Sequence, residues 1–98
     1  MRLPDGYAAV IKQAALDVFG PATVVRLFGS RADDSKRGGD IDLHVETEPE
    51  QATINNDVRF RARLWIELDE PQVDVVVTAR GSEKSWIDRA AEREGVLL

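Results

Sequence analysis

The chain has 98 residues, of which 43% are hydrophobic and 32% are charged, and its formal net charge is −5. This length predicts one domain over residues 1–98, and the acidic balance argues against direct nucleic-acid binding, which depends on clustered Lys and Arg. The sequence has no cysteine and no run near the roughly 18 apolar residues that span a membrane. We therefore expect neither disulfides nor membrane contact, and we expect a cytoplasmic location.

The first predicted element is a helix over residues 7–19, because apolar residues recur there at the spacing of one helix face. Asp5 lies where a side chain can cap the start of this helix. Gly20-Pro21 ends the helix, since proline cannot continue it.

A buried strand is predicted over residues 23–28, where the sequence TVVRLF is β-branched and apolar. The strand stops at Gly29. Ser30 and the segment RADD after it predict a short helix, and the chain turns back at residues 37–39. The cations that flank this Gly-Ser turn are Arg31, Lys36 and Arg37.

The segment DIDLHVE, residues 40–46, alternates with the period of two that is typical of a strand. Its aliphatic residues face one side of the strand. Its polar residues face the other side, and they are Asp40, Asp42, His44 and Glu46. We interpret His44, the only histidine, as an exposed strand residue, with a contact to the acidic face as the alternative.

Amphipathic spacing predicts another helix over residues 52–68. The residues expected on its inner face are Ile54, Val58, Trp65 and Leu68. Its three arginines are two positions apart, so they fan around the helix: Arg59, Arg61 and Arg63. We interpret them as solvated, with at most one of them reaching toward a phosphate. Residues 72–78, with the mostly apolar sequence QVDVVVT, predict a third strand.

A last helix is predicted over residues 81–95, with Ser82 as its N-cap and Gly95 as its C-cap. The residues expected to face inward are Trp86, Ile87, Ala90 and Ala91. We interpret Trp86 and the earlier Trp65 as anchors in the core or against a partner.

These elements predict a member of the α/β (α+β) class with a small mixed three-stranded sheet flanked by helices. A short segment joins the first two strands, which suits an antiparallel pair, and a helix separates the second from the third, which suits a right-handed parallel crossover. The end of the first strand then lies beside the starts of the other two. Gly29-Ser30 is therefore expected near three acids, Asp40, Asp42 and Asp74.

Two interpretations of this acidic cluster stay open. Asp40 and Asp42 would lie about 6.6 Å apart along the strand, which lets both reach metal ions spaced about 3.5–4 Å apart, as in two-metal phosphoryl transfer. Magnesium prefers such oxygen ligands and takes others from water and phosphates. The alternative is a solvated strand face. Asp74, inside the apolar segment VDVVV, favours the metal site, because an acid is costly to bury without a cation.

The stretch LFGSRADDSKRGGDIDLHVE, followed by an aspartate in VDVVV, resembles the minimal nucleotidyltransferases of the DNA polymerase beta superfamily. Their signature is Gly-Ser, about nine or ten residues, Asp-x-Asp, and a third aspartate on a later strand. In this chain residues 31–39 separate Ser30 from Asp40. The resemblance implies the nucleotidyltransferase fold, with Gly29 and Ser30 at the triphosphate of ATP. Arg31, which follows this turn in the sequence, is expected to contact the nucleotide as well.

For the acids, the resemblance implies that Asp40 and Asp42 bind two Mg²⁺ ions. It implies that Asp74 binds the catalytic ion and helps to deprotonate the acceptor. Members of this length are commonly paired with a helical protein of the HEPN type in toxin–antitoxin systems, where some of them transfer AMP to the partner.

Two functions therefore remain as hypotheses. The first is an enzyme that transfers a nucleoside monophosphate, AMP from ATP, to a hydroxyl of a partner protein or of a small molecule. The second is an antitoxin that neutralises a helical partner by occlusion without catalysis. The complete set of Asp40, Asp42 and Asp74 favours the enzyme.

Overall fold

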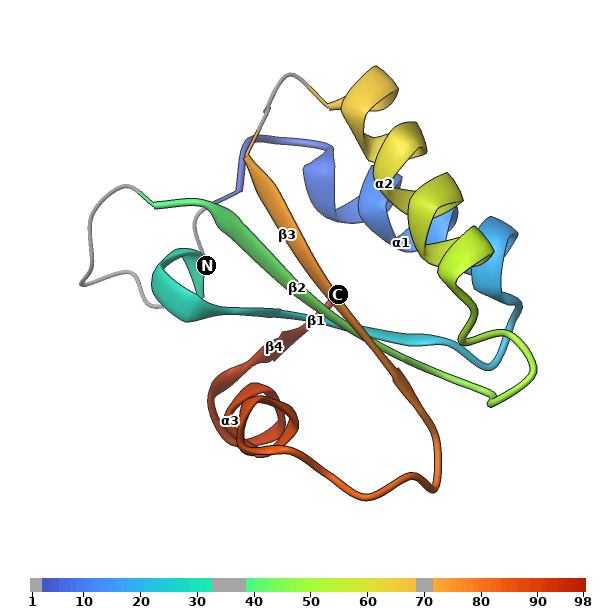
Figure 1. The fold of residues 1–98 in the computed structure, drawn as a ribbon. Coiled ribbons are helices and arrows are strands. Elements are labelled where there is room, and N and C mark those ends of the chain that lie inside the picture. Colours follow the sequence, from blue (N-terminus) through green and yellow to red (C-terminus); the bar gives the residue numbers. More distant parts are fainter. Residues whose placement is uncertain (1–2, 33–38, 69–71) are drawn as a thin grey trace.

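The computed structural model describes residues 3–32, 39–68 and 72–98 of the chain, so the predicted cations Lys36 and Arg37 lie outside the described residues. The elements in chain order are α1 (Tyr7–Phe19), β1 (Val24–Phe28), the 3₁₀ helix η1 (Gly29–Arg31), β2 (Ile41–Thr47), α2 (Ile54–Glu67), β3 (Val73–Ala79), α3 (Trp86–Glu94) and β4 (Val96–Leu97). Helices and strands share one fold (Figure 1), so the predicted α/β class is confirmed. Within the described ranges, no helix has the length and apolar character needed to cross a membrane.

The described strands form one mixed sheet in the order β3-β2-β1-β4. β1 and β2 are antiparallel and β2 and β3 are parallel, both as predicted. The fourth strand was not predicted. Val96 and Leu97 pair antiparallel with Leu27 and Arg26 of β1. The expectation of three strands was wrong because a strand of two residues is too short to show alternation and is defined only by its pairing.

Helices cover both faces of this sheet. In Figure 1, α1 and α2 lie over one face and α3 lies over the other. The hydrophobic core fills the space under α1 and α2, and its fully buried members include Ile11, Phe19, Leu27, Leu43, Phe60 and Leu64. Phe19 of α1 and Phe60 of α2 meet edge to face, with ring centroids 5.5 Å apart. Since the aliphatic side of β2 faces this core, its polar side faces α3.

The start of α1 differs from the expectation. Gly6 is the N-cap, with a positive φ of 86°, and no side chain caps the helix. The amide of Tyr7 donates to the carbonyl of Pro4, so a turn leads the chain into the helix. Asp5 therefore lies within this turn, one residue too early to act as the cap.

The inner face of α2 also differs from the expectation. Phe60 and Leu64, four residues apart, are buried, and Leu68 just beyond the helix is buried as predicted. Ile54, Val58 and Trp65 are exposed to 86, 58 and 67%. Helical geometry puts these three on a stripe different from that of Phe60 and Leu64. The prediction chose the wrong stripe because α2 has apolar residues on two sides.

In α3, the N-cap is Ser85 and not Ser82. Ser85 and Asp88 form a capping box, in which each side chain bonds to the backbone of the other residue. The Ser82 hydroxyl instead donates to the carbonyl of Ala79 in the preceding turn. Trp86, the first residue of the helix, is 79% exposed, so its predicted inward position was wrong, whereas Gly95 is the C-cap as expected.

Candidate functional site

The Gly-Ser turn directly follows β1 and lies against the start of β2. The antiparallel register places Phe28, the last residue of β1, opposite Asp42. Gly29 then has a positive φ of 75°, and a Cβ atom at this position would overlap Oδ2 of Asp42. Only glycine meets both the backbone and the steric requirement. The sequence therefore brings the backbone of this turn into direct contact with the Asp42 carboxylate.

A second glycine closes the turn from the other side. Gly39 has a positive φ of 86°, and a Cβ atom there would overlap the hydroxyl of Ser30. The Arg31 side chain donates from Nε to the carbonyl of Gly39, at 3.2 Å. Gly39 was expected only as a turn residue, and its close packing against Ser30 was missed.

The acids of the candidate site come from two neighbouring strands. Asp42 of β2 and Asp74 of β3 are paired positions in the parallel register, and Asp40 immediately precedes β2. Asp40 and Asp42 are half-buried, whereas Asp74 is exposed. The structure thus brings Asp42 together with Asp74 and Gly29, which the topology inferred from the sequence had indicated.

The electrostatics of Asp42 show how closely these acids interact. Its pKa is raised above the ordinary value, first by burial and then by the negative charges of Asp74 and Asp40, with a hydrogen bond to Asp74 adding to the effect. No Lys or Arg of the described residues forms an ion pair with Asp42. Among the described residues, no cation therefore balances its charge.

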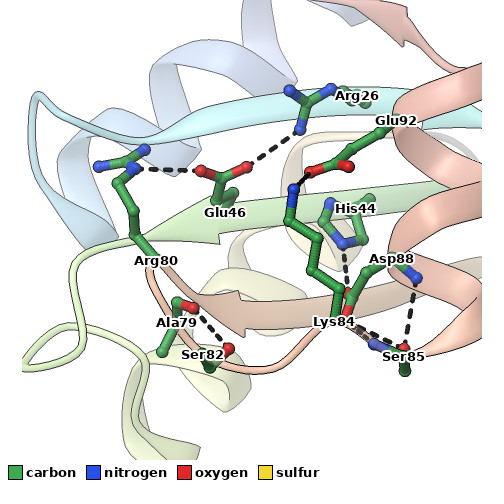
Figure 2. A network of polar contacts seen from close by, with 10 residues as sticks. All are labelled: Arg26, His44, Glu46, Ala79, Arg80, Ser82, Lys84, Ser85, Asp88 and Glu92. Carbon is green, nitrogen blue, oxygen red and sulfur yellow. Dashed lines mark hydrogen bonds and ion pairs between the residues drawn. The ribbon is translucent and has the colours of Figure 1, made fainter.

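Glu46, on the same side of β2, provides the contrast. It bonds to Arg26 at 3.3 Å and to Arg80 at 3.0 Å (Figure 2). Burial acts to raise its pKa, but the hydrogen bonds from Arg80 and Arg26 outweigh it and hold the pKa below the ordinary value. Arg80 also pairs with Glu48 and donates to the carbonyl of Ala22, so Glu46 belongs to a structural network. The acidic face predicted as one unit thus has a neutralised end at Glu46 and, at Asp42, an end without a balancing cation among the described residues.

His44, between these two ends, is buried to 99% of its surface, so its interpretation as an exposed residue was wrong. Its Nε2 lies 2.7 Å from Oδ1 of Asp88 in α3, and Figure 2 shows the two side chains pointing at each other. Burial acts to raise the pKa of Asp88, but hydrogen bonds from His44 and Ser85 hold it below the ordinary value. A carboxylate only accepts, so Nε2–H is the donor. Within the described residues, Nδ1 has no hydrogen-bond partner.

The burial of His44 follows from α3, which covers this part of the polar face. The sequence did carry a signal for it: Ser85 and Asp88 have the spacing of a capping box, which fixes an acid on the first turn of α3. What the sequence alone did not show was that Asp88 uses its second oxygen to reach the sheet.

The arginines of α2 do not reach the acidic cluster. Arg61 bonds to Asp57 and to the carbonyl of Val75, and Arg63 pairs with Asp17 and Glu67. Arg59 bonds to Asn56 on its own helix. Their interpretation as solvated is too simple, because two of them connect α2 to its neighbours.

The donor chemistry of the cluster fits a hard cation such as Mg²⁺, since carboxylate oxygens are its preferred ligands. As the side chains lie, no group of three or more His, Cys, Asp or Glu residues in the described ranges is arranged to hold a metal ion. Mg²⁺ retains water and takes oxygens from phosphates, so it does not need three protein ligands. Asp42 lies beside Asp74 and has no ion pair with a described cation, so the two acids fit a cation that a substrate helps to bind.

No protein-family model matches the chain, and no curated protein matches it.

Proposed function

We propose that this chain is a magnesium-dependent nucleotidyltransferase of the minimal nucleotidyltransferase type. It transfers AMP from ATP to a hydroxyl of a partner protein, and it acts as the antitoxin of a pair with a helical HEPN-type protein. The observation that carries the proposal is the contact of Gly29 with Asp42, which itself lies beside Asp74. A close backbone approach next to carboxylates that repel one another suits a phosphate bound together with a cation.

Each residue has a role in this proposal. Gly29 lets the backbone approach the triphosphate, and Ser30 offers a hydroxyl donor from η1. Asp40, Asp42 and Asp74 would hold Mg²⁺, which neutralises the charge of the phosphates when it is bound. Arg31 keeps the turn closed through its bond to the carbonyl of Gly39 and adds positive charge beside it.

AMP transfer exchanges one bond of the α-phosphorus for another. The oxygen of the acceptor hydroxyl forms a bond to the α-phosphorus of ATP, and the bond from that phosphorus to pyrophosphate breaks. The proton of the hydroxyl moves to Asp74, whose carboxylate is exposed at the end of the sheet. Pyrophosphate leaves with the electron pair.

A second candidate function is occlusion of the helical partner without catalysis. One observation favours it: the described acids do not form a ready-made metal-binding group. Both functions use the same chain and the same partner, so binding to the partner does not separate them.

The test is calorimetry with a nonhydrolysable ATP analogue, in the presence of magnesium and then with a chelator. The proposal expects binding with magnesium and little binding without it, because the repulsion around Asp42 makes the site depend on a cation. Equal binding in the two conditions contradicts the metal-dependent site. No binding in either condition leaves occlusion as the function.

A further inference from the structure

The outer side of α2 carries an apolar stripe that no other described element covers. Ile54, Val58 and Trp65 are four and seven residues apart, so they lie along one side of the helix, and all three are exposed. Trp65 alone leaves 67% of its surface exposed. Large apolar side chains grouped in this way mark an interaction surface more often than single exposed ones do.

The outer edge of the sheet lies on the same side of the molecule. β3 ends the strand order and pairs only with β2 among the described strands. The carbonyl of Gln72 accepts a hydrogen bond from the amide of Ile41, and the amide of Arg80 donates to the carbonyl of Thr47. Even-numbered residues along β3 therefore turn their backbone N–H and C=O groups toward β2. Residues of odd number turn theirs outward, and they include Val73, Val75 and Val77.

Arg61 shows that the stripe and the edge are adjacent. It follows Val58 by three residues and precedes Trp65 by four, so it belongs to the same side of α2. Its Nη2 donates to the carbonyl of Val75, on the outer edge of β3, at 2.6 Å. The apolar stripe therefore continues directly into the sheet edge. We call this combined surface, made of Ile54, Val58, Trp65 and the outer edge of β3, the α2–β3 surface.

We propose that the α2–β3 surface is the interface with a second copy of this chain. The outward amides of Val73, Val75 and Val77 have no hydrogen-bond partner among the described residues. An antiparallel β3 from a second copy would supply their acceptors and continue the sheet across a two-fold axis. The same axis would place the stripe of one α2 against the stripe of the other.

The charges along the α2–β3 surface suit a second copy, and the required area needs both the stripe and the edge strand. In a register centred on Val76, Asp74 lies opposite Thr78 of the second copy, so the two acids do not oppose each other. Asp57 and Arg61, at the margin of the stripe, already pair at 2.6 Å. A stable interface buries about 800 Å² on each partner. One tryptophan buries about 150–250 Å², so the stripe needs the edge strand to reach this size.

The test combines mass measurement with a matched pair of variants. Size-exclusion chromatography with light scattering should give a dimer for the wild type and for Trp86→Glu, and a monomer for Trp65→Glu. Both tryptophans are exposed, at 79 and 67%, and both variants add the same charge, but only Trp65 lies on the α2–β3 surface. Circular dichroism checks that each variant is folded.

Hydrogen exchange tests the strand pairing without depending on a variant. The amides of Val73, Val75 and Val77 should exchange slowly in the wild type and become faster on dilution to the monomer. A wild type that stays monomeric at every concentration overturns the proposal, and so does a dimer that persists in Trp65→Glu. A monomer that instead binds a helical protein through Trp65 assigns the surface to another occupant and also overturns it. The inference does not depend on the proposed catalytic function.

Discussion

Asp42 and Asp74 occupy paired positions on the parallel strands β2 and β3, and the charge of Asp74 contributes to the raised pKa of Asp42. Two carboxylates in this position destabilise the folded chain unless a cation or a proton intervenes. Glu46, farther along β2, has its charge balanced by Arg26 and Arg80. Neutralising Asp42 and neutralising Glu46 should therefore change the stability of the fold in opposite directions.

Asp42→Asn should raise the melting temperature by a few degrees near neutral pH in the absence of metal. A carboxyl whose folded-state pKa is raised binds its proton more readily in the folded chain, so the ionised form costs stability at high pH. The advantage of the variant should therefore shrink as the pH falls through the raised pKa, and vanish below the unfolded value of about 3.9. Thermal denaturation over a pH series measures both effects.

Glu46→Gln is the matched control on the same strand face. The pKa of Glu46 is lowered, so its charge contributes stability above the unfolded value and loses it as the pH falls. This variant should melt below the wild type near neutral pH. If Asp42→Asn also melts several degrees lower, Asp42 has a structural role and the case for a binding site weakens.

The second prediction concerns the glycine that touches Asp42. Gly29→Ala should cost about 1–3 kcal/mol of folding free energy, because alanine at a positive φ is strained. The new Cβ must also displace the Asp42 carboxylate, so binding of the magnesium–nucleotide complex should be lost. Chemical denaturation and calorimetry measure the two effects separately.

Gly81→Ala separates the effect of backbone strain from the effect of displacing the Asp42 carboxylate. Gly81 has a similar positive φ of 86°, but nothing lies within 4 Å of the position of its Cβ. This variant should lose comparable stability and keep nucleotide binding. If both variants bind the nucleotide as well as the wild type does, the Gly29 turn does not contribute to the site.

The third prediction tests the buried His44–Asp88 pair. Asp88→Ala should cost about 2–4 kcal/mol, because it removes the capping box of α3 and leaves the buried His44 without its acceptor. The lowered pKa of Asp88 means that its carboxylate stabilises the fold above the unfolded value, and that this contribution fades as the pH falls through the folded value.

Glu94→Ala on the same helix is the control. Its side chain is 65% exposed, so its loss should change the stability by no more than about 0.5 kcal/mol. Equal effects of the two substitutions, measured by denaturant unfolding, would show that the pair does not hold α3 against the sheet.

The course of the strands could be predicted from the sequence because it depends on strong local signals. The alternation of DIDLHVE, the Gly-Pro break and the lengths of the connections were enough to place Asp42 between Phe28 and Asp74. The β4 strand could not be predicted, because Val96 and Leu97 become a strand only through pairing with β1.

The predictions from the sequence were wrong where one local pattern fits two different structures. α2 has apolar residues on two sides, and periodicity alone does not say which side meets the core. Phe60 and Leu64 fill that space, which leaves Trp65 outside. Likewise, alternation places His44 on the polar face of β2, but only the packing of α3 decides that this part of the face is buried.

The last prediction concerns the transfer step, where Asp74 accepts the proton of the acceptor hydroxyl. Asp74→Asn should lower the rate of AMP transfer to the co-purified helical partner by at least about 100-fold, the contribution expected of a general base. Because Asp74 is exposed at the end of the sheet, the fold and the association with the partner should change little. Intact-mass analysis after incubation with ATP and magnesium measures the transfer, and co-purification measures the association. Asp17→Asn is the control, since Asp17 lies on α1, where its side chain bonds to Arg63 and Gln13. Transfer by Asp74→Asn at the wild-type rate would show that another group accepts the proton. A wild type that binds its partner but never adds mass to it would instead make occlusion the function of this chain.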